Sequence, residues 1–374
     1  MSPGHVAARS LSVAVVSPSL PAAGRKAGGV AQVAHDLAGG LARRGHRVTV
    51  WSFDPLPEGA AYRVAPLPWK RFATSRLGRF ATEGYLGNVL ALLPGYGDAD
   101  AIVAMGDSLL LPLLRKPVVR VMHGSALGEA LAAGSPWRFV SQLGIYPQEL
   151  LTALTQRGCV GVSHNTRRYN PFVRRIIPNG IDLSAFHPGS EKTPEPSVLF
   201  VGTLEGRKRG RLLLESFLAE VRPRHPSATL TLVSPSGPPA EGVVYRTGIS
   251  TAELAGLYRR SWVYASPSSY EGFGLPYLEA MASGTPVVAT PNPGSREVLD
   301  GGRHGLLVED RELGPAILGL LEDGETRREW AERGLERARS YSLERMVDAY
   351  EELLLGLTSR DGGRGTIAIT SPEG

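Results

Sequence analysis

Hydrophobic residues are spaced along the chain in two alternating patterns. Short, continuous apolar runs, such as residues 11–16, predict strands buried in a parallel sheet. Residues 30–41 instead carry apolar side chains every three or four positions, which predicts one buried helix face, and Gly45 follows where that helix should end. Because the two patterns recur along the chain, we expect βα units and doubly wound, Rossmann-like sheets.

These patterns form two series. In the first, strands are expected at residues 11–16, 46–51, 100–105, 117–122 and 159–163. In the second, strands are expected at residues 197–201, 228–233, 243–248, 261–266, 286–290 and 305–308. Further helices are expected at residues 211–221, 250–258, 276–283 and 343–357. The second of these opens with a capping box, formed by Ser250 and Glu253.

A polar, proline-rich stretch at residues 188–196 separates the two series. A chain of 374 residues is long enough to form two cores. We therefore expect two Rossmann-like domains, at residues 1–178 and 179–340, followed by a helix at residues 341–358. The tail at residues 359–374 is rich in Gly, Ser and Thr, and we expect it to be disordered.

Composition narrows the functional classes. The net charge of +5 would help to attract an anionic ligand, but no Lys/Arg run with interleaved aromatics marks a nucleic-acid face. The single cysteine, Cys159, allows no intrachain disulfide, and no apolar run is long enough to span a bilayer.

We expect a cytoplasmic protein, at most peripheral at the inner face of the membrane. Residues 66–80 are basic and aromatic and could make weak membrane contact, although a solvated loop is the favoured interpretation.

The most specific string is SPSSYEGFGLPYLEAMASGTPVVA, at residues 266–289. It joins a strand end to a helix through a glycine-containing turn, and Pro276 fits the first helical turn. The backbone around Gly272, and the N–H groups of Phe273, Gly274 and Leu275, would then lie free at a helix N-terminus. Such a terminus suits a phosphate or a sugar oxygen.

Two glutamates flank this turn. Glu271 precedes it and Glu279 follows eight residues later, so both carboxylates can face one cleft at the carboxyl ends of the strands. Carboxylates there can accept hydrogen bonds from sugar hydroxyls. A glutamate in a first helical turn is also favoured by the helix dipole alone, but the pair around GFGLP favours a binding site.

Basic and small residues add three further candidates. Arg207 and Lys208 follow the strand at residues 197–201 and could neutralise a diphosphate, although a surface basic run is the alternative. His123 follows the strand at residues 117–122, where a loop-capping role is the alternative. The last candidate is a glycine pair at the start of the first helix, formed by Gly28 and Gly29.

The sequence does not predict a bound cofactor. The Rossmann G-x-G-x-x-G spacing is absent, which argues against NAD. There is no D-x-D in a suitable context, no H-E-x-x-H and no cysteine pair, so we expect no metal.

The string EGFGLPYLEAMASGTPVV resembles the E-x7-E signature of the GT-B glycosyltransferases of family four. Gly28-Gly29-Val30 resembles the family's N-domain glycine loop, and IPNGID, at residues 177–182, resembles its interdomain motif. Residues 201–210 (VGTLEGRKRG) and residues 292–307 are similar to further family segments. The resemblance covers most of residues 11–357 and is weakest between about 52 and 115.

This resemblance implies a GT-B fold, in which the first domain binds the acceptor, the second binds the donor and the final helix crosses back to the first. Lys208, with Arg207, would hold the donor diphosphate. Glu279 would bind the ribose, and His123 would lie beside the transferred sugar. The family often has arginine where this chain has Thr203, and we expect Arg207 to supply that charge.

The expected activity is therefore retaining, metal-independent transfer of a hexose-type sugar from a nucleotide-sugar donor to a hydroxyl acceptor. A UDP-sugar is the favoured donor and a GDP-sugar the second, while the acceptor could be a glycan, a lipid or a small molecule. Two alternatives stay open. One is a nucleotide-sugar epimerase on the same architecture, and the other is a non-catalytic sugar-nucleotide binding protein.

Overall fold

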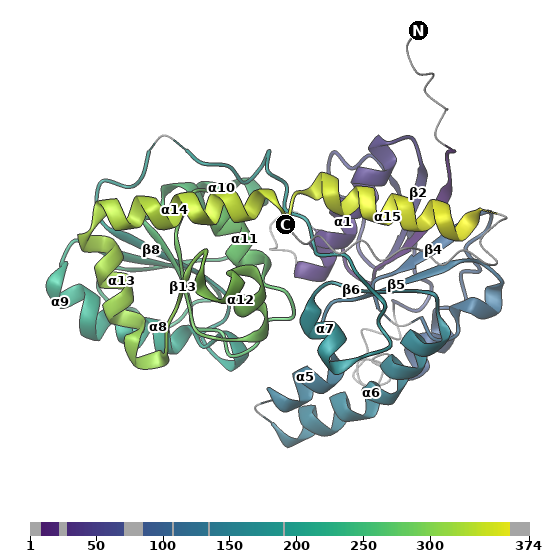
Figure 1. Ribbon diagram of the computed structural model, residues 1–374, viewed down its shortest axis with the longest axis horizontal. Helices are drawn as coiled ribbons and strands as arrows, with labels where there is room; N and C mark the ends of the chain where they lie inside the picture. Colours follow the sequence, from purple (N-terminus) through teal and green to yellow (C-terminus); the bar gives the residue numbers. More distant parts are fainter. Residues whose placement is uncertain are drawn as a thin grey trace, which may run out of the picture.

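The computed structural model describes residues 9–21, 28–70, 85–106, 108–133, 135–189 and 191–359. It consists of two α/β lobes that lie side by side, each built on a parallel sheet flanked by helices (Figure 1). The strand order is β3-β2-β1-β4-β5-β6-β7 in the first sheet and β10-β9-β8-β11-β12-β13 in the second. The doubly wound fold class is therefore confirmed.

The first lobe contains the N-terminal series. Its strands are β1 (Ser12–Val16), β2 (Arg47–Ser52), β3 (Arg63–Pro66), β4 (Ala101–Ala104), β5 (Val118–Met122), β6 (Gly158–Gly161) and β7 (Arg175–Ile176). Its helices are α1 (Gly29–Arg43), α4 (Tyr85–Leu90), the 3-10 helix η1 (Leu111–Leu114), α5 (Ala126–Leu131), α6 (Pro136–Thr155) and α7 (His164–Tyr169). The five strands expected here are present, and Cys159 is buried in β6.

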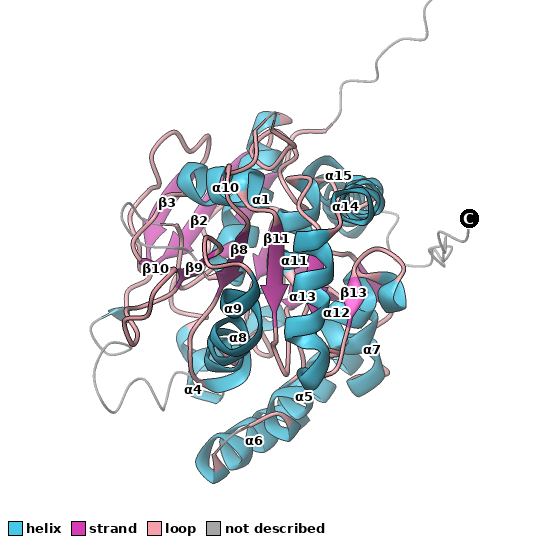
Figure 2. Ribbon diagram, turned by 90° about the vertical axis from the view of Figure 1, so that its left-hand side faces the viewer, coloured by secondary structure: helices cyan, strands magenta, loops and turns pink. Residues whose placement is uncertain are grey.

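The pattern predicted only α1 among the helices of this lobe, and it missed two of the strands. The two strands at the edges of the sheet, β3 and β7, are short and only partly buried, so neither has a continuous apolar run. Helices α5 and α6 also escaped prediction. Helix α6 carries exposed apolar residues such as Trp137 and Val140, which blur the helical period. Both helices project from the first lobe (Figures 1 and 2).

The second lobe contains the C-terminal series. Its strands are β8 (Ser197–Val201), β9 (Thr229–Val233), β10 (Val243–Arg246), β11 (Val263–Ser266), β12 (Val287–Ala289) and β13 (Leu306–Leu307). Its principal helices are α8 (Gly210–Ser216), α10 (Thr251–Arg260), α11 (Leu275–Ala282), α12 (Pro293–Val298), α13 (Leu313–Glu322) and α14 (Gly324–Arg339). All six expected strands are present, and both hydrogen bonds of the capping box at α10 form.

One expected helix, at residues 211–221, is longer and less regular than its pattern indicates. It begins as α8, continues as the π-helical segment η3 (Phe217–Val221) and ends as α9 (Arg222–Arg224). The apolar face that it presents to the sheet is continuous, because Leu213, Phe217 and Val221 are all fully buried. The π-helical turn leaves this face in contact with the core of the second lobe.

The final helix, α15 (Leu343–Thr358), crosses back to the first lobe, where it packs along α1 (Figure 1). A Cβ atom at Gly40 of α1 would overlap the Val347 side chain, so the two backbones approach closely. Glu351 fixes the same contact, because its carboxylate lies 2.8 Å from His46 Nε2 and 2.5 Å from Arg44 Nη1. The crossover that the resemblance implied is thus confirmed.

The strands β7 and β8 lie on either side of the proline-rich stretch, but the exact domain limits stay a prediction. None of the helices within the described ranges is long and apolar enough to cross a membrane. The basic aromatic segment lies outside the described residues from position 71 onward, and so does the tail from position 360.

Candidate active site

A cleft of about 1130 Å³ lies between the two lobes. Because all strands within each sheet are parallel, their carboxyl ends and the loops that follow them gather at one edge of each sheet. All of the residues predicted for the site line this cleft; they are Gly28, Gly29, His123, Arg207, Lys208, Glu271, Gly272, Phe273, Gly274, Leu275 and Glu279. The structure thus brings the candidates together, while their roles stay predictions.

The buried carboxylate of Glu271 lies at the centre of the second lobe's side of the cleft. Lys208 Nζ donates to its Oε1 at 2.5 Å, and Arg207 Nη1 donates to its Oε2 at 3.0 Å. Burial alone would raise the pKa of Glu271, but the charges of Lys208 and Arg207 outweigh it and hold the pKa below its ordinary value. The carboxylate is therefore ionised at neutral pH, and both of its oxygens are engaged.

Two loops bring these three side chains together. One follows β8 and contains the single 3-10 turn of Gly206–Lys208; the other follows β11 and leads into α11. Two hydrogen bonds join them: Ser269 N donates to the backbone oxygen of Arg207 at 2.8 Å, and the Arg209 side chain donates through Nε to Pro267 O at 2.6 Å. Arg207 also donates to the carbonyl of Tyr270. The cations are thus held against the glutamate by the loops themselves.

The N-terminus of α11 provides uncharged donors. Its N-cap, Gly274, adopts a φ of 108°, a conformation that favours glycine, and Pro276 occupies the first turn. Among the hydrogen bonds of the described residues, none uses the backbone N–H of Phe273, Gly274 or Leu275. These N–H groups lie at the positive end of a helix dipole and can receive phosphate or sugar oxygens.

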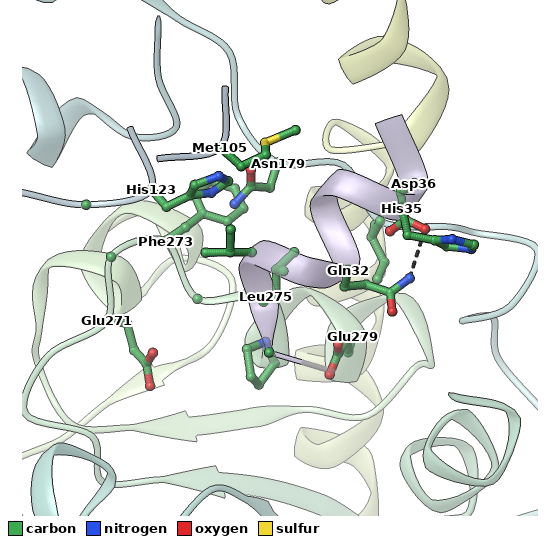
Figure 3. A pocket seen from close by; sticks show the side chains of 18 of the residues that line it. Gln32, His35, Asp36, Met105, His123, Asn179, Glu271, Phe273, Leu275 and Glu279 are labelled. Atoms are coloured by element: carbon green, nitrogen blue, oxygen red, sulfur yellow. Dashed lines mark hydrogen bonds between the residues drawn. The ribbon is translucent and has the colours of Figure 1, made fainter. Parts of the chain in front are cut away.

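The other end of the cleft carries carboxylates from both lobes. Glu279 of α11 accepts a 2.7 Å hydrogen bond from the Tyr258 hydroxyl. Across the cleft lie Gln32 and Asp36 of α1, which are joined by a 2.8 Å hydrogen bond (Figure 3). Burial raises the pKa of Asp36 to about 7; the Gln32 amide opposes the shift, and the charges of Asp182 and Glu279 add to it.

His123 marks the boundary between the lobes. It follows β5, and its ring lies near Phe273 and Asn179 (Figure 3). Burial, with a contribution from the nearby Arg120 charge, lowers the pKa of His123 to about 4, so the imidazole is neutral at physiological pH. Among the described residues, its buried Nε2 has no hydrogen-bond partner.

The backbone of the two lobes meets at Gly272. A Cβ atom there would overlap the carbonyl oxygen of His123, and the Gly272 carbonyl accepts a 3.1 Å hydrogen bond from Ser163 Oγ. A second contact lies close by, where Glu297 of α12 accepts a 2.8 Å hydrogen bond from the backbone N–H of His164 at the start of α7. These contacts fix His123 relative to the glutamate loop.

Sequence reasoning did not single out several polar residues that line this cleft, among them Asp36, Asn179 and Arg120. Asp36 belongs to the apolar helix pattern of α1 and gave no separate signal. Asn179 was recognised only as part of IPNGID, yet its side chain is buried and its Oδ1 lacks a partner among the described residues. Arg120 did carry a signal, because an arginine inside the run VVRVM is out of place in a buried strand.

The arrangement can hold an anion next to a polyhydroxyl group. Lys208, Arg207 and the α11 N-terminus supply positive potential, while Glu271 and Glu279 supply acceptors at either end. No group of three or more metal-ligating side chains occurs within the described ranges, and metal independence stays a prediction.

Two family models match most of the chain. The model described as Glycosyltransferase Family 4 matches residues 27–185, and the model described as Glycosyl transferases group 1 matches residues 195–323. Among curated proteins, the D-inositol 3-phosphate glycosyltransferase of Corynebacterium jeikeium (strain K411) is 33% identical over 217 residues, 48% of this chain and 52% of that protein. The chain spans 48% to 64% of the length of the first such relatives that it matches.

Solved structures resemble the whole molecule. Sucrose-phosphate synthase from Thermosynechococcus elongatus superposes with a TM-score of 0.73 at 22% identity, over 92% of this chain and 98% of that chain. Anabaena Alr3699/HepE, solved in complex with UDP and glucose, gives a TM-score of 0.69 at 18% identity, over 92% and 99% of the two chains. At these identities the likeness shows a shared fold.

Proposed function

The chain belongs to the GT-B glycosyltransferases of family four, and from this premise we propose that it transfers a hexose-type sugar from a nucleotide-sugar donor to a hydroxyl acceptor. The observation that carries the proposal is the contact of Lys208 and Arg207 with Glu271 beside the N-terminus of α11. A donor diphosphate and its sugar need this combination, in which cations and N–H groups face an anion while a carboxylate faces hydroxyls.

Each half of the donor then has its own partners. The diphosphate is received by Lys208, Arg207 and the N–H groups at the start of α11, and Glu271 accepts hydrogen bonds from the sugar. The ribose lies at the other end of α11, where Glu279 accepts from its hydroxyls. Closure of the lobes over the donor excludes water and limits hydrolysis.

We propose that transfer retains the anomeric configuration. Both oxygens of Glu271 are engaged by cations, which makes this carboxylate a poor nucleophile and favours direct attack by the acceptor. The acceptor oxygen forms a bond to the anomeric carbon on the face from which the diphosphate oxygen departs with the bonding electron pair. The acceptor proton passes to that departing oxygen. Neutral His123 stabilises the sugar by a hydrogen bond instead of by charge.

The donor base is proposed to be uracil, with guanine second. The complex of Anabaena HepE with UDP and glucose, on a shared fold, supports this order. We also propose that transfer needs no metal, since Lys208, Arg207 and the α11 N-terminus supply the positive charge that a departing diphosphate requires. Removing one such donor typically raises a barrier by about 3 kcal/mol.

A transfer assay tests the proposal. The protein is incubated with UDP- and GDP-sugars, with and without a panel of hydroxyl acceptors, and release of the nucleoside diphosphate is measured. Transfer predicts acceptor-dependent release, unchanged by a chelator, and a product whose anomeric configuration by NMR matches the donor. Donor isomerised without acceptor would instead indicate an epimerase, and nucleotide binding without any release would indicate a non-catalytic protein.

A further inference from the structure

Arg120 occupies an unusual position in the interior of the first sheet. It lies at the centre of β5, where its neighbours across the sheet are Ala104 of β4 and Cys159 of β6. All five residues of β5 are buried, and Arg120 is only 5% exposed. An arginine is almost never buried in this way unless an opposite charge pairs with it.

Among the described residues, no carboxylate forms an ion pair with Arg120. Arg120 takes part in no ion pair or hydrogen bond there, and its buried Nε and Nη1 have no partner. Glu149 of α6 also lines the cleft, but its Oε2 accepts a 2.9 Å hydrogen bond from Ala126 N instead. The guanidinium therefore keeps at least two of its donor groups unused.

Although it is buried, Arg120 is one of the residues that line the cleft. It lies on the side of the first lobe, where His123, Met105 and Gln142 also line the cleft. This side is separate from the donor cations, because Lys208 and Arg207 lie in the second lobe and are engaged by Glu271. An anion that reaches Arg120 therefore belongs to the acceptor and not to the donor diphosphate.

We propose that Arg120 is an acceptor-binding residue that pairs with a phosphate group carried by the acceptor. The proposal rests on the proposed function, and it adds the chemical class of the acceptor. The planar fork of a guanidinium matches phosphate oxygens in a bidentate manner, and burial strengthens such a pair. The phosphate positions the acceptor hydroxyl toward the sugar beside His123. The cost of an unpaired cation in the sheet is offset only when this acceptor is bound.

The test compares matched acceptors on wild type, Arg120→Met and Arg120→Lys. The probes are myo-inositol 3-phosphate against myo-inositol, and phosphatidylinositol vesicles against vesicles of a galactosyl diacylglycerol, which carries hydroxyls but no phosphate. Wild type should prefer one phosphate-bearing probe by roughly 10- to 100-fold in kcat/KM. A preference for myo-inositol 3-phosphate indicates a soluble phosphorylated acceptor, and a preference for phosphatidylinositol indicates a lipid acceptor. Arg120→Met should abolish this preference through the KM of the acceptor, leaving the KM of the donor unchanged, and Arg120→Lys should keep part of it.

Two further results separate this inference from the proposed function. With the donor site filled by saturating UDP, inorganic phosphate or myo-inositol 3-phosphate should raise the Tm of the wild type but not that of Arg120→Met, and this readout needs no turnover. Arg120→Met itself should melt no lower than wild type, because it removes an unpaired buried charge. Transfer with equal kcat/KM for both kinds of acceptor, or no phosphate-dependent rise in Tm, would overturn the inference. Absence of any nucleotide release would instead count against the proposed function.

Discussion

The Lys208 ammonium lies 2.5 Å from Oε1 of Glu271, and both side chains are largely buried at the edge of the second sheet. Arg207 occupies the other carboxylate oxygen at 3.0 Å. The carboxylate thus holds two cations in the cleft before any donor arrives. In the proposed function, an incoming diphosphate would meet charges that are already positioned, which would lower the reorganisation needed for transfer.

Lys208→Ala should reduce turnover by about 100-fold, because one of the groups that receives the departing diphosphate is lost. It should also lower the free energy of unfolding by roughly 1–3 kcal/mol, since the buried Glu271 carboxylate loses one of its two cationic partners. Turnover assays and urea denaturation measure the two effects. Arg211→Ala is the matched control, because Arg211 pairs with Glu205 at the surface. Equal turnover in Lys208→Ala and wild type would contradict the assignment.

Gly272→Ala should separate the two lobes near the site. The new Cβ atom would overlap the backbone oxygen of His123, which cannot move without shifting the loop after β5. We expect kcat to fall about 100-fold, the effect of a displacement of about 1 Å. Gly319→Ala is the control, because a Cβ atom there meets nothing within 4 Å. Similar kcat values for the two variants would show that the close approach at Gly272 has no part in catalysis.

Asp36 should make the free energy of unfolding fall as the pH rises, whereas most aspartates in folded proteins have the opposite effect. Burial raises its pKa to about 7 from 3.8, so the folded protein retains a proton that the unfolded chain releases. The contribution of Asp36 to the free energy of unfolding is fully present below about pH 4 and is lost as the pH rises to 7. Asp36→Asn should therefore raise the Tm more at pH 8 than at pH 5, as measured by calorimetry.

The exposed variant Asp98→Asn controls for the loss of one negative charge. An equal change in Tm at both pH values for Asp36→Asn would mean that Asp36 is ionised throughout this range. The shift attributed to burial would then be wrong.

His123 should not titrate in the physiological range. Burial lowers its pKa to about 4 from an ordinary value of 6.5, so its NMR chemical shift should stay constant from pH 5.5 to 8. The resonance is identified by its loss in His123→Ala, which should also transfer sugar more slowly. A titration centred near pH 6.5 would contradict the neutral role proposed for this ring.

The regular parts of the fold could be predicted because their signals are local. The apolar run of β8 and the capping box of Ser250 and Glu253 depend on residues within a few positions of one another, and both were predicted. The short edge strands β3 and β7 were not predicted, because half-buried residues at a sheet edge need no continuous apolar pattern.

The site was predictable only where its residues share a motif. Glu271 and Glu279 lie eight positions apart on one turn and helix, so their common cleft follows from local geometry. Asp36 faces this cleft only because α1 packs opposite the second lobe, a contact between segments distant in the chain. Arg120 has no partner among the described residues because of how β5 packs against α6. This packing joins distant segments of the chain, so no local sequence motif predicts it.

The central claim is that Lys208 and its neighbours receive a nucleoside diphosphate. Isothermal titration calorimetry of UDP and GDP against wild type, Lys208→Ala and Arg211→Ala tests it most directly. We predict saturable binding to wild type and to Arg211→Ala, weakened roughly 10- to 100-fold in Lys208→Ala by the loss of a charged hydrogen bond. Equal affinity for all three proteins, or no binding of either nucleotide to wild type, would contradict the account.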